Sequence, residues 1–175
     1  MTSPVRKPAV SETPPPAGTV DAFKSAMRVL ASGVSVITAG AGDGRRGVTA
    51  SAVCSVTMEP PTLLVCVNRA GESYEAIREA GSFCVNLLGG DGEAAALCFA
   101  GQTEHRGVEQ FAPFSWTSLK TGAPALEGAL ANVDCEISDT IDKGTHAVFF
   151  GTVREVRVRE GTAALVHFNR SFTSV

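Results

Sequence analysis

Residues 33–69 read GVSVITAGAGDGRRGVTASAVCSVTMEPPTLLVCVNR, and this stretch decides the fold of the chain. Its first part, residues 34–39, is rich in β-branched side chains and predicts a strand. Residues 40–47 hold four glycines and predict a hairpin loop, after which residues 48–57 form the returning strand. Pro60 and Pro61 must end that strand, since each lacks a backbone donor. The apolar run Leu63–Val67 predicts a strand that is buried on both faces.

The same stretch has residue types that suit a ligand-binding wall. Small side chains allow a flat ring to lie close to the backbone while hydroxyls offer hydrogen bonds, and this strand carries Thr49, Ala50, Ser51 and Ser55. Arg69, at the end of the next strand, can pair with a phosphate. Gly71-Glu72-Ser73 opens a predicted helix whose free N–H groups favour an anion. The alternative is an ordinary sheet that exposes Ser and Thr to solvent.

The composition of the chain excludes several classes of protein. The chain has 175 residues, of which 44% are hydrophobic and 19% charged, as in a soluble globular domain. Its net charge of −3 gives no electrostatic reason to expect nucleic acid binding. No apolar run approaches the roughly 20 residues of a membrane helix, and the N-terminal residues lack a signal core. We therefore expect a cytoplasmic protein without a membrane or nucleic acid partner.

Cysteine and histidine usage argues against a metal site. The five cysteines are odd in number, form no C-x-x-C pair and lie in apolar surroundings, so we interpret them as reduced and mostly buried. A catalytic thiol would need an electropositive setting, which the sequence does not provide. The three histidines do not fall at metal-ligand spacing, and no metal is expected.

The remaining chain predicts one domain with three short helices. Residues 1–18 hold five of the nine prolines and are interpreted as a disordered tail before a domain at 19–175. Asp21 is predicted to cap a helix that carries Phe23, Met27 and Leu30 on one face and ends at Gly33. Two further helices are predicted, one through Ala80 with Ser73 as the cap and Gly81 as the stop, and one from Gly92 to Ala100 with Asp91 as the cap.

The sequence pattern in the second half of the chain predicts further strands. Residues 131–138 alternate with period two, placing Ala131, Val133, Cys135 and Ile137 on one face and Asn132, Asp134, Glu136 and Ser138 on the other. The strand 147–158 slips phase between Val153 and Val156, which indicates a bulge. Strands are also predicted at 83–88 and 165–168, and residues 102–111 form either a lid or a loop. About seven strands that do not alternate with helices favour a mainly β, antiparallel barrel with peripheral helices.

Six segments in this order resemble the flavin reductase family with the FMN-binding split-barrel fold, the reductase component of two-component flavin-dependent monooxygenases. They are GVSVIT, GVTASAVCSVTMEPPTLLVCVNR, GSFCVNLL, CFAG, KGTHAVFFGTV and LVHFNRSF. The resemblance covers about residues 21 to 172. It implies an antiparallel, Greek-key-like split β-barrel and a homodimer with flavin sites near the subunit interface. It also implies that NADH or NADPH reduces FMN or FAD, and that reduced flavin leaves for a partner monooxygenase.

The resemblance also assigns residues to the site. His146 matches a histidine linked to nicotinamide binding. The expected cofactor-binding residues are Thr49, Ala50, Ser51, Ser55, Val67, Asn68, Arg69, Ser73, Phe99, Ala100, Phe168 and Arg170. The family usually has Gly-Asp-His where this chain has Gly144-Thr145-His146. The missing carboxylate would have raised the affinity of the histidine for a proton. The alternative role for His146 is a turn histidine that makes one backbone hydrogen bond.

Other functions on the same fold stay open. One is a module that binds flavin or haem without nicotinamide turnover. Another is an enzyme of the pyridoxamine phosphate oxidase type, which would need more basic residues than the pair Arg45-Arg46. The choice between FMN and FAD and between NADH and NADPH is also open. Arg45, Arg46 and Arg106 are candidates for contact with a nicotinamide phosphate.

Overall fold

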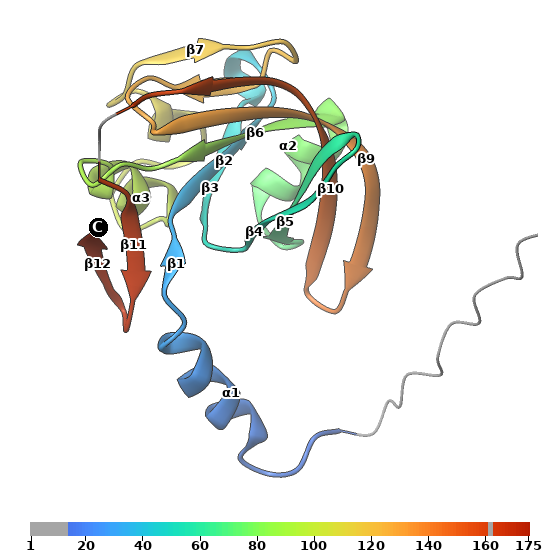
Figure 1. Cartoon of the computed structure of the whole chain (residues 1–175), viewed down its shortest axis with the longest axis vertical. Helices are drawn as coiled ribbons and strands as arrows, with labels where there is room; N and C mark the ends of the chain where they lie inside the picture. Colours follow the sequence, from blue (N-terminus) through green and yellow to red (C-terminus); the bar gives the residue numbers. More distant parts are fainter. Residues whose placement is uncertain (1–13, 161–162) are drawn as a thin grey trace, which may run out of the picture.

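A seven-stranded antiparallel sheet organises the computed structural model, which describes residues 14–160 and 163–175 (Figure 1). Residues 1–13 of the predicted tail therefore lie outside the described residues. The strand order is β3-β2-β6-β9-β10-β5-β4. Their bounds are β2 Ser35–Ala39, β3 Arg46–Ala50, β4 Val53–Met58, β5 Pro61–Asn68, β6 Ser82–Leu87, β9 Ala131–Lys143 and β10 His146–Val158. The predicted mainly β, antiparallel architecture is confirmed.

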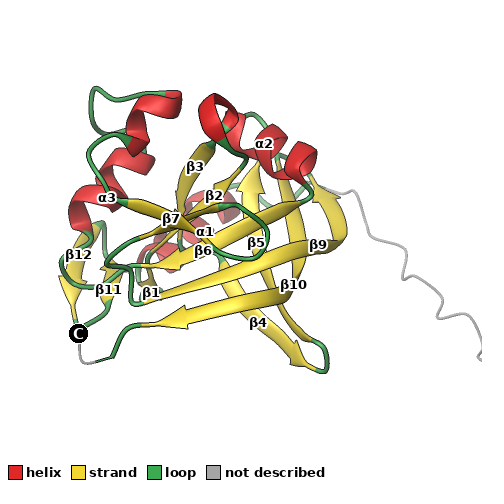
Figure 2. Cartoon of the chain, turned by 90° about the horizontal axis from the view of Figure 1, so that it is seen from above, coloured by secondary structure: helices red, strands yellow, loops and turns green. Residues whose placement is uncertain are grey.

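The sheet is curved, and its two edge strands, β3 and β4, follow each other directly along the chain (Figure 2). β3 pairs with β2 and β4 pairs with β5, so the returning strand predicted at 48–57 is in fact two strands. Only Ser51 and Ala52 separate them. The sheet is not closed into a hydrogen-bonded barrel, because β3 and β4 are not paired with each other. This opening is the split of a split barrel.

The interior of the curved sheet holds the main core. Its fully buried members come from four strands and a helix: Ile37, Val65, Ile77, Phe83 and Phe149. In β5, Leu63, Val65 and Val67 are buried while Leu64 and Cys66 are only half-buried. The prediction that this run is buried on both faces is therefore only partly right, because one face of the strand lies outside the barrel.

Helices α2 and α3 pack against the sheet, whereas α1 projects away from it (Figure 1), and none of the three has a side-chain N-cap. α1 spans Thr19–Arg28, α2 Glu72–Ala80 and α3 Glu93–Phe99. The predicted caps Asp21, Ser73 and Asp91 are wrong, since the N-cap residues are Gly18, Gly71 and Gly92. Glycine is tolerated there because it needs no Cβ. Gly81 ends α2 with a φ of 64°, as predicted.

Helix α1 ends earlier than predicted because the chain after it enters a second sheet. This three-stranded sheet has the order β1-β11-β12, with bounds β1 Ser32–Gly33, β11 Leu165–Phe168 and β12 Ser171–Ser174. Strand β12 was not predicted, whereas β11 was. The α1 side chains Phe23 and Met27 are 62% and 46% exposed. The apolar face that the sequence predicts therefore has no partner within the described chain.

The β9–β10 hairpin is the longest pairing in the sheet. Its register shifts between Phe150 and Gly151 and again between Val153 and Glu155, and the second shift confirms the predicted bulge. Gly151 is required at the first, because a Cβ there would lie 2.5 Å from the Phe83 ring. The turn of this hairpin, at Gly144 and Thr145, lies level with the end of β5, where His146 pairs with Asn68.

A buried polar network lies beneath a short hairpin, β7 Trp116–Ser118 and β8 Pro124–Leu126. We use this name for Thr38, Asn86, Asn132 and Asp134, all at most 1% exposed. The Asn86 amide donates to the Val36 carbonyl and to Thr38 Oγ1, at 2.9 and 3.0 Å. Its oxygen accepts from Leu126 N and Asn132 Nδ2, at 2.8 and 2.7 Å. The alternation in β9 predicted the two faces correctly, but the polar face is also buried here.

The cysteines are free thiols, as the sequence predicts. Cys84, Cys98 and Cys135 are buried, Cys66 is half-buried and Cys54 is exposed. Burial, with a smaller contribution from the charge of Asp134, raises the pKa of the Cys135 thiol to about 12. None of the helices in the described residues is both long and apolar enough to cross a membrane.

Candidate functional site

The split of the sheet exposes small hydroxylated residues. Thr49 and Ala50 are half-buried at the end of β3. Ser51, which directly follows β3, and Ser55 in β4 are exposed. The Thr49 hydroxyl donates to the Ala96 carbonyl at 2.7 Å and so ties β3 to α3. The hydroxyls of Ser51 and Ser55 make no hydrogen bond with the described residues. The edge of the sheet therefore offers two free hydroxyls beside unpaired strand backbone.

The end of β5 places a cation beside an aromatic ring. Val67 is buried, whereas Asn68 and Arg69 are exposed. The Arg69 guanidinium lies 6.0 Å from the centre of the Tyr74 ring and 3.4 Å from the Asp142 carboxylate. Its side chain remains 44% exposed, so the charge stays accessible to a ligand. A forked guanidinium of this kind can bind a phosphate through two hydrogen bonds.

His146 lies at the same end of the sheet. In the β5–β10 pairing it is the direct partner of Asn68, so both side chains project from one face. The ring is exposed, and its Nδ1 lies 2.9 Å from the Thr145 hydroxyl. A hollow of about 530 Å³ opens beside this group. Its lining residues are Asn68, Arg69, Ala70, Tyr74, Glu75, Arg78 and Thr145. The structure thus places Asn68, Arg69 and His146 at the same end of the sheet, and Asn68 and Arg69, but not His146, line the hollow.

Ser73 lies inside α2 and does not begin it. Its hydroxyl donates to the Gly47 carbonyl at 2.9 Å, and the residue is 8% exposed. The hydroxyl therefore joins α2 to β3. Its contact with a phosphate stays a prediction, and the free N–H groups at the start of the helix are the nearer donors for an anion.

Phe99 supports the site from inside. It is 3% exposed and packs edge-on against Phe111 and Trp116, with ring centres 5.0 and 5.7 Å apart. A Cβ on Gly47 would lie 2.6 Å from the Phe99 ring, so the ring presses on the backbone of β3. Ala100, at the end of α3, is exposed. Sequence reasoning missed the aromatic cluster because its members lie on three separate elements, a helix, a 3-10 turn and a strand, that no periodic pattern brings together.

Phe168 and Arg170 lie in a different sheet from His146. Phe168 ends β11 and is 45% exposed, and Arg170 is in the turn to β12 with a φ of 67°. Asn169 donates its N–H to the Arg28 carbonyl at 2.9 Å, which places this turn beside the end of α1. Figure 1 shows β11 and β12 on the side away from the β9–β10 turn. Within one chain, the structure does not bring these two residues to the other predicted ones.

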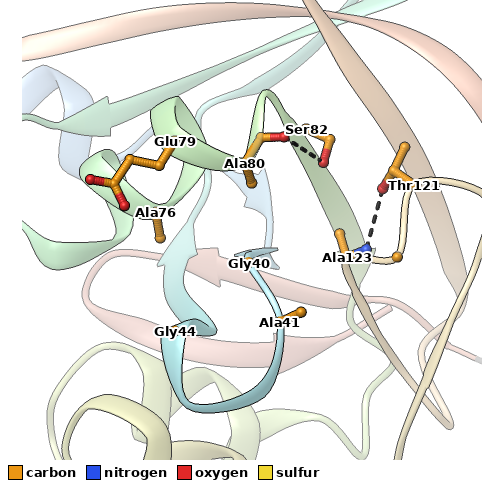
Figure 3. Close-up of a pocket in the computed structure, with 10 residues that line it drawn as sticks. Gly40, Ala41, Gly44, Ala76, Glu79, Ala80, Ser82, Thr121 and Ala123 are labelled. Carbon is orange, nitrogen blue, oxygen red and sulfur yellow. Dashed lines mark hydrogen bonds between the residues drawn. The ribbon is translucent and has the colours of Figure 1, made fainter.

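A second cavity, of about 410 Å³, was not predicted from the sequence (Figure 3). It lies between the β2–β3 loop, the end of α2 and the turn before β8. Its lining residues are Gly40, Ala41, Gly44, Ala76, Glu79, Ala80, Ser82, Thr121, Gly122 and Ala123. The lining offers one carboxylate, two hydroxyls and no basic side chain. It is therefore a poorer candidate than the end of β5.

The arginines proposed for a nicotinamide phosphate already have partners. The Arg46 side chain contacts the Glu72 carboxylate at 2.5 Å and donates to two backbone carbonyls. Arg106 donates to the carbonyls of Thr103 and His105. Arg45 stacks on Phe111, 4.8 Å from the ring centre. In the described part of the chain, no three His, Cys, Asp or Glu side chains are grouped closely enough to hold a metal ion.

Comparison with known proteins gives a consistent picture. The family model described as "Flavin reductase like domain" matches residues 27–175. The FMN reductase (NADH) RutF of Pseudomonas syringae pv. syringae is 43% identical over 151 residues, covering 86% of this chain and 84% of that protein. The 4-hydroxyphenylacetate 3-monooxygenase reductase component of Pseudomonas aeruginosa is also 43% identical over 151 residues, covering 86% of this chain and 89% of that protein.

A solved structure of a similar protein points to the same family. The Streptomyces globisporus NADH:FAD oxidoreductase SgcE6, in complex with NAD and FAD fragments, superposes with a TM-score of 0.81 at 29% identity. The match covers 93% of this chain and 96% of that chain.

Proposed function

We infer the function of this chain from its family, because it belongs to the flavin reductase-like proteins. It is an oxidoreductase in which a reduced nicotinamide reduces a flavin. In finer detail, we propose that the flavin is FMN and the reductant is NADH. Reduced FMN then diffuses to a partner monooxygenase.

One observation carries the proposal: Asn68, Arg69 and His146 converge at one end of the sheet, next to the split. The exposed hydroxyls of Ser51 and Ser55 would hold the ring system or its ribityl chain, and the guanidinium of Arg69 would hold the phosphate. Val67 would pack under the ribityl chain. Flavin supplies the redox chemistry by accepting a hydride, and the protein supplies orientation and charge.

The open form of the site agrees with a flavin that leaves after reduction. Ser51, Ser55, Asn68 and Arg69 are all exposed, so they could be reached from solvent without opening of the core. A prosthetic flavin is usually buried to a greater extent, as ligand sites cover most of a tightly bound molecule. The exposure therefore favours flavin as a diffusible substrate.

NADH is favoured over NADPH by the engaged arginines. A nicotinamide phosphate needs a free cation, whereas Arg46 and Arg106 are held by partners of this chain and Arg45 is stacked on Phe111. The names of relatives that are about 43% identical specify FMN and NADH, in line with this choice.

We further propose a homodimer. The apolar side chains Phe23 and Met27 of α1 are exposed, and apolar faces of this kind are commonly covered by a partner. Phe168 and Arg170 lie beside the end of α1, away from His146 of the same chain. A second copy seated against α1 would supply them to the site of its neighbour. This arrangement would place each flavin near the subunit interface.

The test is NADH and NADPH oxidation, followed by nicotinamide absorbance, with FMN, FAD, riboflavin or no flavin. We expect flavin-dependent turnover, fastest with NADH and FMN. Arg69→Ala should raise the KM for FMN. The control is Arg154→Ala, which should leave this KM unchanged, because Arg154 is similarly exposed but lies further along β10, away from His146. A flavin or haem spectrum without nicotinamide oxidation would instead identify a binding module.

A further inference from the structure

We propose that the hollow beside Arg69 holds the AMP half of FAD, and that Arg78 determines how tightly this chain binds FAD relative to FMN. This inference rests on the proposed function, because the AMP half is joined to the flavin phosphate that Arg69 would bind. FAD contains FMN and adds only this half, here called the adenylate arm. The inference makes FAD a second flavin of this chain and gives a role to residues that the sequence did not single out.

The hollow has the size and position that an adenylate arm requires. Its volume is about 530 Å³, and pockets for small molecules have volumes of roughly 300–1,000 Å³. Arg69 lines it from the end of β5, while Tyr74 and Arg78 line it from α2. Tyr74 and Arg78 are four residues apart and therefore share one face of the helix. The hollow thus begins at the arginine proposed for the flavin phosphate and continues along α2.

Two guanidinium groups in the lining have donors to offer. The side-chain contacts of Arg69 are long, 3.4 Å to the Asp142 carboxylate and 3.5 Å to the Gly144 carbonyl. Arg78 donates Nε and Nη2 to one carboxylate oxygen of Glu75, at 2.9 and 2.7 Å, and its Nη1 has no partner among the described residues. Guanidinium groups are well suited to bind phosphate. We therefore assign the flavin phosphate to Arg69 and the second phosphate of FAD to Arg78.

The lining also offers a directed donor and an aromatic face. Asn68 Oδ1 accepts a hydrogen bond from the backbone N–H of Ala70 at 3.0 Å. A backbone N–H can only donate, so this contact fixes the amide oxygen and leaves the Nδ2 donors available to a ligand. The Tyr74 ring packs against Phe149, with ring centres 5.8 Å apart, and is half-buried. Aromatic side chains of this kind stack on nucleobases, which suits adenine.

Glu75 is the unfavourable group in the lining, and its pair with Arg78 makes the inference testable. Removing the Arg78 guanidinium would delete a phosphate donor and leave the carboxylate unpaired in the hollow. Replacing Glu75 by glutamine would remove the negative charge and free the guanidinium for FAD. The two changes should therefore shift FAD affinity in opposite directions. A purely structural role of this exposed pair would instead give small losses in both variants.

The test is isothermal titration calorimetry of the full chain with FMN and with FAD, in the absence of a nicotinamide. We expect the native chain to bind FAD at least as tightly as FMN. Arg78→Ala should raise the dissociation constant for FAD about three- to tenfold and change that for FMN less than about twofold. Glu75→Gln should lower the dissociation constant for FAD. Both positions are exposed on α2, and alanine and glutamine favour helix, so both variants are expected to fold.

Two controls separate a local contact from a change in overall charge. FMN and FAD carry a similar charge near neutral pH, so a long-range effect of the lost arginine would alter both affinities equally. Arg154→Ala removes an arginine from a comparable surface pair, 2.7 Å from the Glu136 carboxylate on the β9–β10 hairpin. This variant should leave the affinities for both flavins unchanged.

Four results would overturn the inference. They are native binding of FAD more than about tenfold weaker than that of FMN, an unchanged FAD affinity in Arg78→Ala, equal losses for the two flavins in that variant, or weaker FAD binding in Glu75→Gln. An unchanged FAD affinity with a raised KM for NADH would assign the hollow to the adenylate arm of NADH. Absence of NADH and NADPH oxidation with every flavin would instead sink the proposed function, while the calorimetric ratio of FAD to FMN would still decide the role of Arg78.

Discussion

Polar side chains gather in two regions of this molecule, and the regions differ in how their hydrogen bonds are satisfied. In the buried polar network, the Asn86 side chain makes five hydrogen bonds, one of them from the Cys84 thiol, and Asp134 accepts two from Thr121, at 2.6 and 2.7 Å. At the open end of the sheet, the Ser51 and Ser55 hydroxyls have no partner among the described residues. The Arg69 guanidinium there pairs with the exposed carboxylate of Asp142.

The polar groups of the first region stabilise the fold, whereas those of the second region are available to a ligand. A buried polar group must find partners within the fold, because leaving it unpaired costs free energy. An exposed group at a sheet edge is paired with water and can exchange that water for a ligand. Four variants test whether the two regions behave in this way, from the largest expected effect to the smallest.

Asn86→Ala should have the largest effect, on stability. It removes five hydrogen bonds from a fully buried site and leaves partners unpaired, so we expect the free energy of unfolding to fall by about 3–4 kcal/mol. Asn68→Ala, the matched change at the exposed end, should change it by less than about 0.5 kcal/mol. Urea titrations measure both. Equal losses in the two variants would remove the distinction between the regions.

Phe23→Ser should weaken the homodimer and leave the fold of each subunit intact. The ring is 62% exposed in the single chain, and burying a phenylalanine in an interface contributes about 1.5–3 kcal/mol. The dissociation constant of the dimer should rise at least about tenfold. Sedimentation equilibrium measures it, with Lys24→Ser on the same helix as the control. A native chain that is monomeric at all concentrations would contradict the proposed dimer.

Arg69→Ala should reduce flavin affinity with little loss of stability. A hydrogen bond to a charged group contributes about 1.5–3 kcal/mol, so the dissociation constant for FMN should rise at least about tenfold. The surface pair with Asp142 contributes less than about 1 kcal/mol to folding. Fluorescence titration with FMN and riboflavin measures the effect. Because riboflavin lacks the phosphate, an equal loss for both ligands would place Arg69 away from that group.

The buried thiol beside the network should give the smallest effect, a dependence of stability on alkaline pH. The pKa of Cys135 is raised from 9.0 to about 12, so the thiol ionises in the unfolded chain before it ionises in the folded one. The unfolding free energy is therefore unaffected by this group below pH 9 and falls as pH rises from 9 toward 12. Urea titrations between these limits should show a shallower fall in Cys135→Ala. The exposed Cys54 serves as control, and Cys54→Ala should keep the native slope.

Much of the fold could be predicted from the sequence because local patterns report it. The hairpin around the glycine-rich loop, the break at Pro60 and Pro61, the stop at Gly81 and the bulge after Val153 each depend on residues that are close together along the chain. The order of six segments then indicated the family, which the comparisons confirm.

The burial of Asn132 and Asp134 could not be predicted in the same way. Period-two alternation says that residues share a face, but not whether that face meets water. The cover comes from β7 and β8, which lie earlier in the chain and cross over β9 only in the folded state. For the same reason the division of residues 48–57 into two strands was missed, since β3 and β4 pair with different strands, β2 and β5, near opposite edges of the sheet.

By itself, the sequence determined the chemistry available to this protein: a strand of small hydroxylated residues, an arginine after a buried strand, and a histidine after a glycine turn. Only the tertiary structure decided which of these meet. It brought Asn68, Arg69 and His146 together through the register of β5 with β10 and turned Ser73 inward. It also placed Phe168 and Arg170 in a separate sheet. The physical reason is that residue types are local, whereas proximity and burial depend on contacts between strands far apart in the chain.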